Sequence, residues 1–332
     1  MKVFVFSLGL VLSLCLSGHA QPFQLPTANH ALFESGGEER FFVGTSGKSW
    51  VTGTFGSVRS DGWQMHEGID IRSIQRDRRG EPTDPVLATS DGTVVYISTR
   101  PALSNYGKYI VIRHQVDGID IYSLYAHLSE IVSGLAVGQA VRAGQQIAIM
   151  GRTSNTHERI SKDRAHVHFE LNLFYNERFS SWFKKESNER NDHGDWNGQN
   201  LAGLDPRLIL LEERTSGFNL AAWIQNRPEL CRVFIRKSNL SWARRYPALV
   251  VDNPVARQQG VAGYEVSLDG NGVPFRLVPR AASEVKGNSK YQLIVVNETE
   301  YGQNHARRLV IHKGSRWYLG PKCIHLLDLL SW

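Results

Sequence analysis

From about residue 42 to residue 171, the hydrophobic positions come in short runs that are β-branched or alternate with polar residues. Alternation with period two is typical of β-strands, and glycine-rich breaks between the runs are typical of turns. No helical period persists in this part of the chain. The pattern therefore predicts a mainly β fold with tight connections. Its clearest expected strands are Thr93–Ser98, Tyr109–Arg113, Ile119–Leu124 and Gln146–Met150.

The pattern changes after about residue 218, where apolar runs are separated by longer polar turns. We expect a helix over Leu220–Arg227. Residues 218–332 are numerous enough for a domain of their own, so we expect a smaller β-rich or α+β domain there, with a binding or substrate-positioning role. Its expected strands are Tyr264–Leu268, Phe275–Val278, Tyr291–Val296 and Arg308–His312.

The N-terminal residues have the order of a secretory signal. Lys2 precedes an apolar run, Val3–Leu16, and the small residues Gly18 and Ala20 follow it. This order predicts a signal peptide over residues 1–20, cleaved after Ala20, and a polar lead segment over residues 21–41. The apolar run is too short to span a membrane comfortably. We therefore expect an exported protein, in the periplasm or outside the cell, without stable membrane insertion.

Charge and cysteine content refine this expectation. The net charge of +6 would draw an exported protein to anionic polymers of the cell envelope. Basic and aromatic residues do not interleave as they do in nucleic-acid-binding segments, so we expect no nucleic acid as a partner. Cys231 and Cys323 remain after removal of the signal, and one pair in an exported chain predicts a disulfide. Two unpaired, buried thiols are the alternative.

Two short strings carry residues that suit a metal ion: His66-Glu67-Gly68-Ile69-Asp70 and His166-Val167-His168-Phe169-Glu170. Residues two or four apart share one face of an extended segment, so His66 lies with Asp70, and His166 with His168. Gly68 lets the backbone bend toward an ion. Catalytic zinc commonly takes three protein ligands and leaves a position for water. The strings therefore predict a metal site with three ligands and one spare histidine.

A third string, Tyr125-Ala126-His127, lies between these two. With all three strings in this order, residues 42–171 resemble the lysostaphin-type (LytM-like) zinc endopeptidases of bacterial cell walls. The resemblance implies a compact antiparallel β-sheet core of the duplicated hybrid motif, a groove over one sheet and one Zn²⁺ per chain. It also includes the connecting segments Val51–Gly56, Val86–Val94, Tyr106–His114 and Val137–Gly151.

The resemblance also implies a role for each residue of the site. His66, Asp70 and His168 would bind the zinc, while His127 and His166 would stand beside the metal-bound water as catalytic residues. Which of these two accepts the proton of the water and which stabilises the oxyanion stays open. Glu170 either orients a ligand as a hydrogen-bond acceptor or is an ordinary strand-end carboxylate. The other histidines, including His114, His193 and His325, are expected to pack or to face solvent.

The chain departs from the family pattern in two inserts, 152–165 and 172–204, within an expected peptidase domain over residues 42–212. The second insert carries several aromatic residues, among them Trp182 and Trp196. It follows the HxH strand directly. It could therefore form a wall of the groove, or it could be a self-packed excursion from the domain.

The implied function is a secreted zinc endopeptidase that acts on the peptide stems and cross-links of bacterial peptidoglycan. The alternative from another class is a non-catalytic activator or scaffold of other wall hydrolases. Such members of the family have typically lost metal ligands, whereas this chain keeps all of them. A zinc peptidase that cleaves proteins rather than cell wall is a third possibility.

Overall fold

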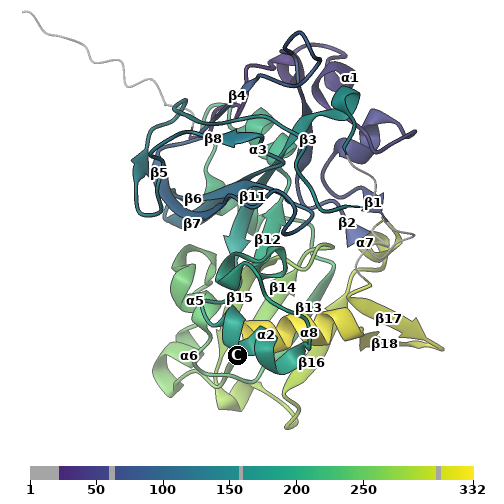
Figure 1. The fold of residues 1–332 in the computed structure, drawn as a ribbon. Helices are drawn as coiled ribbons and strands as arrows, with labels where there is room; N and C mark the ends of the chain where they lie inside the picture. The colour runs from purple at the N-terminus through teal and green to yellow at the C-terminus, as the bar shows by residue number, and fades with distance from the viewer. Residues whose placement is uncertain (1–21, 60–63, 157–159, 304–307) are drawn as a thin grey trace, which may run out of the picture.

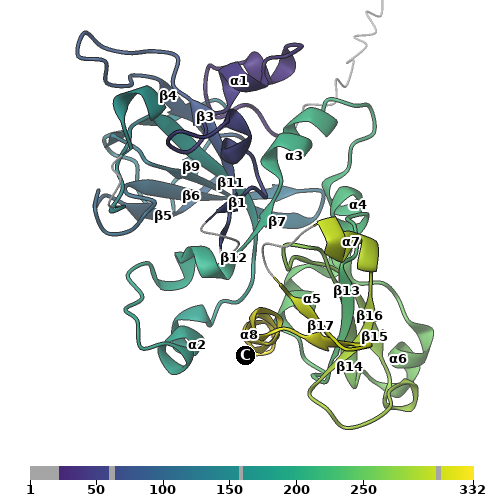
Figure 2. The same cartoon turned by 90° about the vertical axis from the view of Figure 1, so that its right-hand side faces the viewer.

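The structure is a computed structural model that describes residues 22–59, 64–156, 160–303 and 308–332. The expected signal peptide therefore lies outside the described residues. None of the helices in the described part of the chain has the length and apolar character needed to cross a membrane. Figures 1 and 2 show a sheet-rich N-terminal part and a second, smaller sheet with helices around it in the C-terminal part.

An antiparallel seven-stranded sheet forms the N-terminal part. Its strand order is β12-β11-β7-β6-β5-β9, and β3 pairs with β11 as well. The expected strands at 93–98, 109–113 and 119–124 are present, and each is longer than expected. The mainly β, antiparallel fold is thus confirmed. The strands are β3 (Ile69–Arg72), β5 (Gly92–Ser98), β6 (Tyr109–Val116), β7 (Ile119–Ala126), β9 (Ala140–Val141), β11 (His166–Phe174) and β12 (Leu201–Leu204).

Smaller elements surround this sheet. A three-stranded sheet has the order β4-β10-β8, and β1 pairs with β2. These strands are β1 (Val58–Arg59), β2 (Gln64–Met65), β4 (Pro85–Leu87), β8 (Glu130–Ile131) and β10 (Gln146–Ile149). The short helices are η1 (Ala31–Phe33), α1 (Glu38–Phe41), η2 (Trp50–Gly53) and η4 (Lys162–Arg164).

Strand β11 is buried along its whole length, and its two faces have different chemistry. Successive side chains of a strand point to opposite faces. Val167 and Phe169 belong to the main hydrophobic core. His166 and His168 alternate with them and are also buried, at 3% and 6% exposure. One strand therefore supplies both a part of the core and a row of buried polar groups.

The long insert is a loop between two paired strands. Strand β11 continues through Phe174, and β12 pairs back onto it with Phe174 opposite Leu201. Residues 172–174, which the sequence assigned to the insert, therefore belong to the sheet. The excursion proper contains α2 (Phe179–Glu186), η5 (Gly194–Trp196) and η6 (Gly198–Asn200).

A four-stranded antiparallel sheet, β15-β14-β13-β16, organises the C-terminal part. The expected helix after residue 220 and the four expected strands are present, while β13 and the terminal helix α8 were not anticipated. The strands are β13 (Cys231–Ile235), β14 (Gly263–Leu268), β15 (Pro274–Arg280), β16 (Tyr291–Val296), β17 (Val310–Lys313) and β18 (Arg316–Leu319). The helices are α3 (Pro206–Glu212), α4 (Leu220–Gln225), α5 (Ser241–Arg245), η7 (Pro247–Leu249), α6 (Pro254–Gln259), η8 (Ala282–Glu284), α7 (Glu298–Gln303) and α8 (Pro321–Leu330).

The C-terminal part is fastened to the end of β11. The main-chain N–H of Phe174 donates to the hydroxyl oxygen of Tyr246 over 2.7 Å, and Arg245 donates to the main-chain oxygen of Phe174 over 3.0 Å. The Tyr175 hydroxyl donates to the main-chain oxygen of Gly272 over 3.2 Å. One hydrophobic cluster runs through both parts of the chain. The two sheets therefore share a core instead of being joined by a free linker.

The expected disulfide between Cys231 and Cys323 is not present. Both residues are free, buried cysteines. The two thiols are neighbours and share a hydrogen bond. This hydrogen bond raises the pKa of the Cys231 thiol, and burial raises it further. Cys231 begins β13 and Cys323 lies in α8, so the pair packs between the sheet and the terminal helix. Here the cysteines act as small buried apolar residues.

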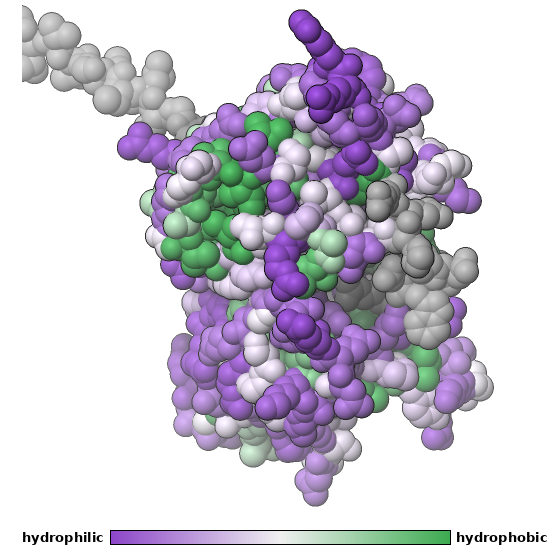
Figure 3. All heavy atoms as spheres, in the orientation of Figure 1, coloured by the Kyte–Doolittle hydropathy of each residue, from purple (hydrophilic) through white to green (hydrophobic). Residues whose placement is uncertain are grey.

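The face of the molecule shown in Figure 3 is largely hydrophilic, with an apolar area over β5 and β8. Val132 and Val137, which are 36% and 61% exposed, lie in the connection between β8 and β9.

The contact between β11 and Tyr246 leads to a stability prediction. In Tyr246→Phe, the buried N–H of Phe174 loses its acceptor, and leaving a buried donor unsatisfied costs about 1–3 kcal/mol. We expect the free energy of unfolding, measured by urea denaturation, to fall by that amount. Tyr318→Phe is the matched control, because Tyr318 is 44% exposed. Equal stability of the two variants would contradict the prediction.

Candidate metal centre

Three neighbouring segments bring the residues of the three sequence motifs together. Strand β3 pairs with β11 so that Asp70 lies opposite His168, and β7 pairs with the other edge of β11 and ends just before His127. His66 lies between β2 and β3, next to a bend and not within a continuous strand. At Gly68 a Cβ atom would lie 2.4 Å from the main-chain oxygen of Phe169. Only glycine therefore lets this segment cross so close to β11.

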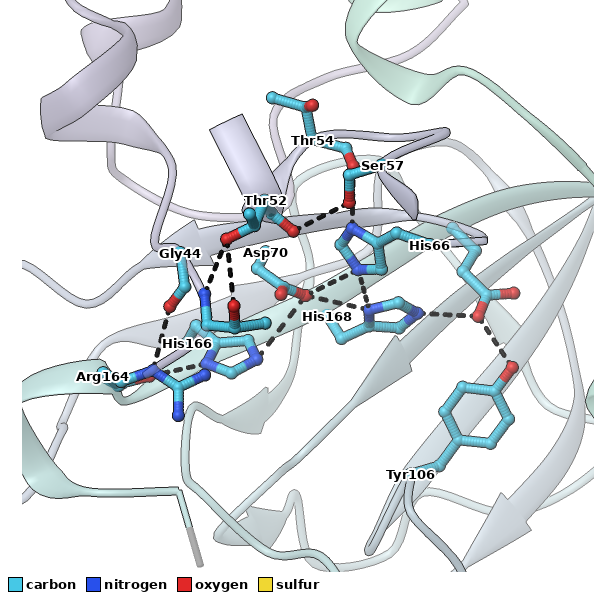
Figure 4. A network of polar contacts seen from close by, with 12 residues as sticks. Gly44, Thr52, Thr54, Ser57, His66, Asp70, Tyr106, Arg164, His166 and His168 are labelled. Carbon is cyan, nitrogen blue, oxygen red and sulfur yellow. Dashed lines mark hydrogen bonds and ion pairs between the residues drawn. The ribbon is translucent and has the colours of Figure 1, made fainter. Parts of the chain in front are cut away.

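The three expected metal ligands form a compact triangle, shown in Figure 4. His66 Nε2 lies 3.0 Å from Asp70 Oδ1 and 3.0 Å from His168 Nδ1. His168 Nδ1 lies 2.9 Å from Asp70 Oδ1. Ligands about 2.0–2.1 Å from a tetrahedral zinc ion would be about 3.3 Å apart. A small outward movement of these atoms would therefore accommodate the ion, and the group could hold a metal.

The hydrogen bonds on the outer side of the histidines fix their orientation. In three of the histidines, Nδ1 donates a hydrogen bond to a main-chain carbonyl oxygen, because that oxygen can only accept. When the ring is neutral, its Nε2 atom therefore carries a lone pair. His66 Nε2 and His166 Nε2 point toward Asp70 Oδ1, at 3.0 and 3.5 Å. The donor and acceptor pairs are His66 with Thr54, His127 with Thr153 and His166 with Arg164, at 2.9, 2.9 and 2.6 Å.

The fourth histidine is oriented by a buried carboxylate. His168 Nε2 donates to Glu170 Oε1 over 2.8 Å. Glu170, which is fully buried, also accepts from the Tyr106 hydroxyl and from Asn172 Nδ2, each over 2.8 Å. A carboxylate behind a ligating histidine fixes the ring and increases its basicity. Glu170 is thus the orienting acceptor and not an ordinary strand-end carboxylate.

The arrangement concentrates lone pairs and negative charge in a buried place. Nitrogen lone pairs and the Asp70 oxygen converge there, with Asp70 only 3% exposed. Buried acceptor groups of this kind are unfavourable unless a cation neutralises them. The mixed nitrogen and oxygen donor set is the one that zinc prefers in catalytic sites. The residues present therefore fit a divalent metal ion.

The pKa values of the site reflect the same need for positive charge. Burial alone would raise the pKa of Asp70, but His66, His166 and His168 outweigh burial and hold this pKa well below its usual value. Burial alone would lower the pKa of His168, but hydrogen bonds to Asp70 and Glu170 raise it to about 10. Without metal, a proton on His168 Nδ1 therefore lies in the triangle of ligand atoms.

The two accessory histidines lie beside the triangle. The rings of His127 and His166 meet edge to face with their centroids 4.8 Å apart, and His127 lies 5.9 Å from the ring of His168. Burial lowers the pKa of both, that of His127 to well below its usual value. Both rings are therefore neutral near pH 7 and able to accept a proton.

The site opens into a groove of about 1470 Å³. Of the histidines discounted from the sequence, His114 is indeed structural: it is 1% exposed, and burial lowers its pKa to about 4. His193 and His325 do line the groove, at some remove from the triangle. The insert forms part of the wall, while its aromatic side chains are largely packed. The groove residues of the insert are Tyr175, Trp182, His193, Asn197, Gly198, Gln199 and Leu201.

Tyr106 and Asn172 are the members of the site that the sequence did not reveal. Both act through Glu170. Asn172 lies on β11 itself, and Tyr106 lies in a loop 64 residues before Glu170. The alternation along β11 had already placed Glu170 on the histidine face, and the same alternation could have placed Asn172 there. No local signal marked Tyr106.

The role of Glu170 yields a prediction. Glu170→Gln removes the charge behind His168 but keeps the shape of the side chain. Loss of such an outer partner typically weakens metal binding by about 10- to 100-fold. We expect that decrease in zinc affinity from competition with a chromophoric chelator. Glu177→Gln, a change at a mostly exposed carboxylate, is the control. Unchanged affinity in Glu170→Gln would show that the carboxylate does not support the ligand.

A second prediction concerns pH. The pKa of His168 near 10 means that metal must displace its proton at any lower pH. We expect about one proton to be released per metal bound from this group, and the apparent affinity to rise about tenfold per pH unit between pH 7 and 9. Calorimetry in buffers of different ionisation enthalpy measures the released protons. A pH-independent affinity would rule out this competition.

With the geometry established, comparisons with known proteins identify the family. The model of Peptidase family M23 matches residues 64–180. The murein hydrolase activator NlpD of Escherichia coli K12 is 37% identical over 127 residues, which are 38% of this chain and 26% of the relative. A crystal structure of a zinc-containing peptidase from Vibrio cholerae is 27% identical, with 40% of this chain and 34% of that chain covered and a TM-score of 0.28.

The similarity is confined to one part of the chain. The chain spans only about a quarter to a third of the length of the first curated relatives it matches. The lipoprotein NlpD of Yersinia enterocolitica is 35% identical over 95 residues, which are 29% of this chain and 84% of that relative. This relative is thus covered almost in full. Through the region that contains His66, Asp70 and His168, the chain belongs to peptidase family M23.

Proposed function

We propose that the protein is a zinc-dependent endopeptidase that hydrolyses peptide cross-links of bacterial peptidoglycan. The observation that carries this proposal is the complete donor set, in which His66, Asp70 and His168 form a triangle with edges of 2.9–3.0 Å. Two further neutral histidines stand beside it, inside a groove large enough for a peptide. We also propose that the protein acts in the cell envelope, as the names of its lipoprotein relatives suggest.

The residues around the triangle can supply what hydrolysis of an amide requires. Bound zinc would polarise the scissile carbonyl and lower the pKa of a water molecule. His127 and His166, held by Thr153 and Arg164, can accept a proton from that water and deliver it to the leaving amine. Glu170 holds His168 in place throughout. The groove positions the peptide relative to these groups.

The names of the relatives favour a second candidate function. NlpD of Escherichia coli is described as a murein hydrolase activator. As an activator, this protein would bind peptidoglycan or a hydrolase and would not itself cleave peptides. An activator has no chemical need for a buried metal triangle with two accessory histidines. For that reason we place the endopeptidase first.

The test is digestion of purified sacculi by the zinc-loaded protein, followed by mass spectrometry of the released muropeptides. We expect His127→Ala and His166→Ala to retain zinc and to lose about 10²–10⁴-fold in turnover, the usual contribution of acid–base assistance. His168→Ala should lose the metal itself. His30→Ala, a change at an exposed histidine outside the groove, should behave like the unaltered protein.

Three outcomes separate the alternatives. Wild-type turnover in either accessory variant would remove that histidine from the mechanism. No cleavage by the zinc-loaded protein, together with stimulation of an added wall hydrolase that survives His127→Ala, would establish the activator role. Cleavage of glycine-rich proteins but not of sacculi would point to a protein substrate.

A further inference from the structure

The groove that contains the metal-binding cluster extends beyond the region shared with the family. It continues to the C-terminal helix α8, and the insert and the C-terminal part both contribute to its walls. Pockets for small molecules usually enclose about 300–1,000 Å³, and this groove of about 1470 Å³ is larger. It therefore suits an extended chain that reaches past the metal. The side chains at this far end include Trp182, Leu309, His325, Leu326 and Leu329.

Helix α8 is held in place by the segment that follows β11. Asn176 Nδ2 donates to the main-chain oxygen of Leu329 over 2.6 Å. The rings of Trp182 and His325 meet edge to face with centroids 4.5 Å apart. Figures 1 and 2 both place α8 beside α2. Because this segment continues the strand that carries His168, the α8 wall has a defined position relative to the metal ligands.

The two ends of the groove differ in chemistry. The metal end presents imidazole nitrogens and a carboxylate, whereas the α8 end presents the partly accessible side chain of Leu326 over buried leucines. Leu309 and Leu329 are each 2% exposed, while Leu326 is half-buried and His325 is exposed. A half-buried leucine in the wall of a groove is stabilised when an apolar group of a ligand covers it. The far end therefore favours a ligand with an aliphatic side chain.

We propose that Leu326 and His325 form a subsite that binds an aliphatic side chain of the substrate peptide away from the cleaved bond, with the buried ring of Trp182 packed behind His325. The inference rests on the proposed function, and it identifies the preferred substrate as a long, cross-linked peptide and not a short one. Helix α8 lies well outside residues 64–180. The subsite is thus a feature of this chain that the family match does not contain.

The experiment compares two ligands and three variants of the full chain. The ligands are a cross-linked muropeptide dimer and a short peptide that spans only the cleaved bond. Binding is measured by calorimetry in a His127→Ala background, so that hydrolysis does not consume the ligand, and kcat and KM are measured in the chain with His127 intact. The variants are Leu326→Ala, His325→Ala and Ile324→Ala. The last is the matched control, because Ile324 lies on the same helix, is 41% exposed and does not line the groove.

We expect Leu326→Ala to weaken binding of the dimer by about tenfold or more, the usual range for lost apolar contacts in a pocket. His325→Ala should weaken it less, and because the His325 ring packs against Trp182, its thermal unfolding should first be shown to match that of the unaltered chain. Both changes should raise KM for the dimer while kcat and binding of the short peptide stay constant. Ile324→Ala should change nothing.

Equal effects on the two ligands, or no effect in Leu326→Ala and His325→Ala, would overturn the subsite. This result is distinct from failure of the proposed function. If the dimer binds in a Leu326-dependent way but is never cleaved, the subsite stands and the endopeptidase fails. If sacculi are cleaved and Leu326 has no influence, the endopeptidase stands and the subsite fails.

Discussion

One buried carboxylate oxygen, Asp70 Oδ1, determines the arrangement of the whole site. Three imidazole nitrogens, from His66, His166 and His168, lie within 3.5 Å of it. A charge removed from water needs compensation close by, and here a proton or a metal ion provides it. The close crossing at Gly68, the register between β3 and β11, and the carboxylate of Glu170 all serve to hold these groups around one point.

The sequence predicted the cluster because its members come in local pairs. Spacings of two and four residues, in HxH and HxxxD, already place side chains on one side of a segment. His66 and Asp70 meet for a different reason than expected, because the chain bends at Gly68 instead of running as a continuous strand. Long-range contacts escaped prediction. Tyr106 reaches Glu170 across 64 residues, and the burial that makes Glu170 a partner of His168 is a property of the folded sheet.

For the fold as well, local patterns were predicted and long-range packing was not. The short β-branched and alternating runs predicted β5, β6 and β7 well, and β6 and β7 are largely buried on both faces, between two hydrophobic clusters. The terminal helix α8 was missed, although it completes both the C-terminal core and the groove. The prediction of a disulfide was wrong, because the number of cysteines says nothing about their surroundings. Cys231 and Cys323 lie where a small apolar side chain is needed between β13 and α8, and free thiols satisfy that need.

Strand β11 links the chemistry of the site to the rest of the molecule. Near its start, His168 is one corner of the triangle and His166 lies beside it, and its last residue, Phe174, is held by Tyr246 and Arg245 of the C-terminal part. Strands and packed helices shift as units, because their cores are close-packed. The C-terminal part is therefore joined to the site through one strand, and α8 also contributes to the wall of the groove. The position of the C-terminal part and the geometry of the histidine cluster are consequently both tied to the same strand.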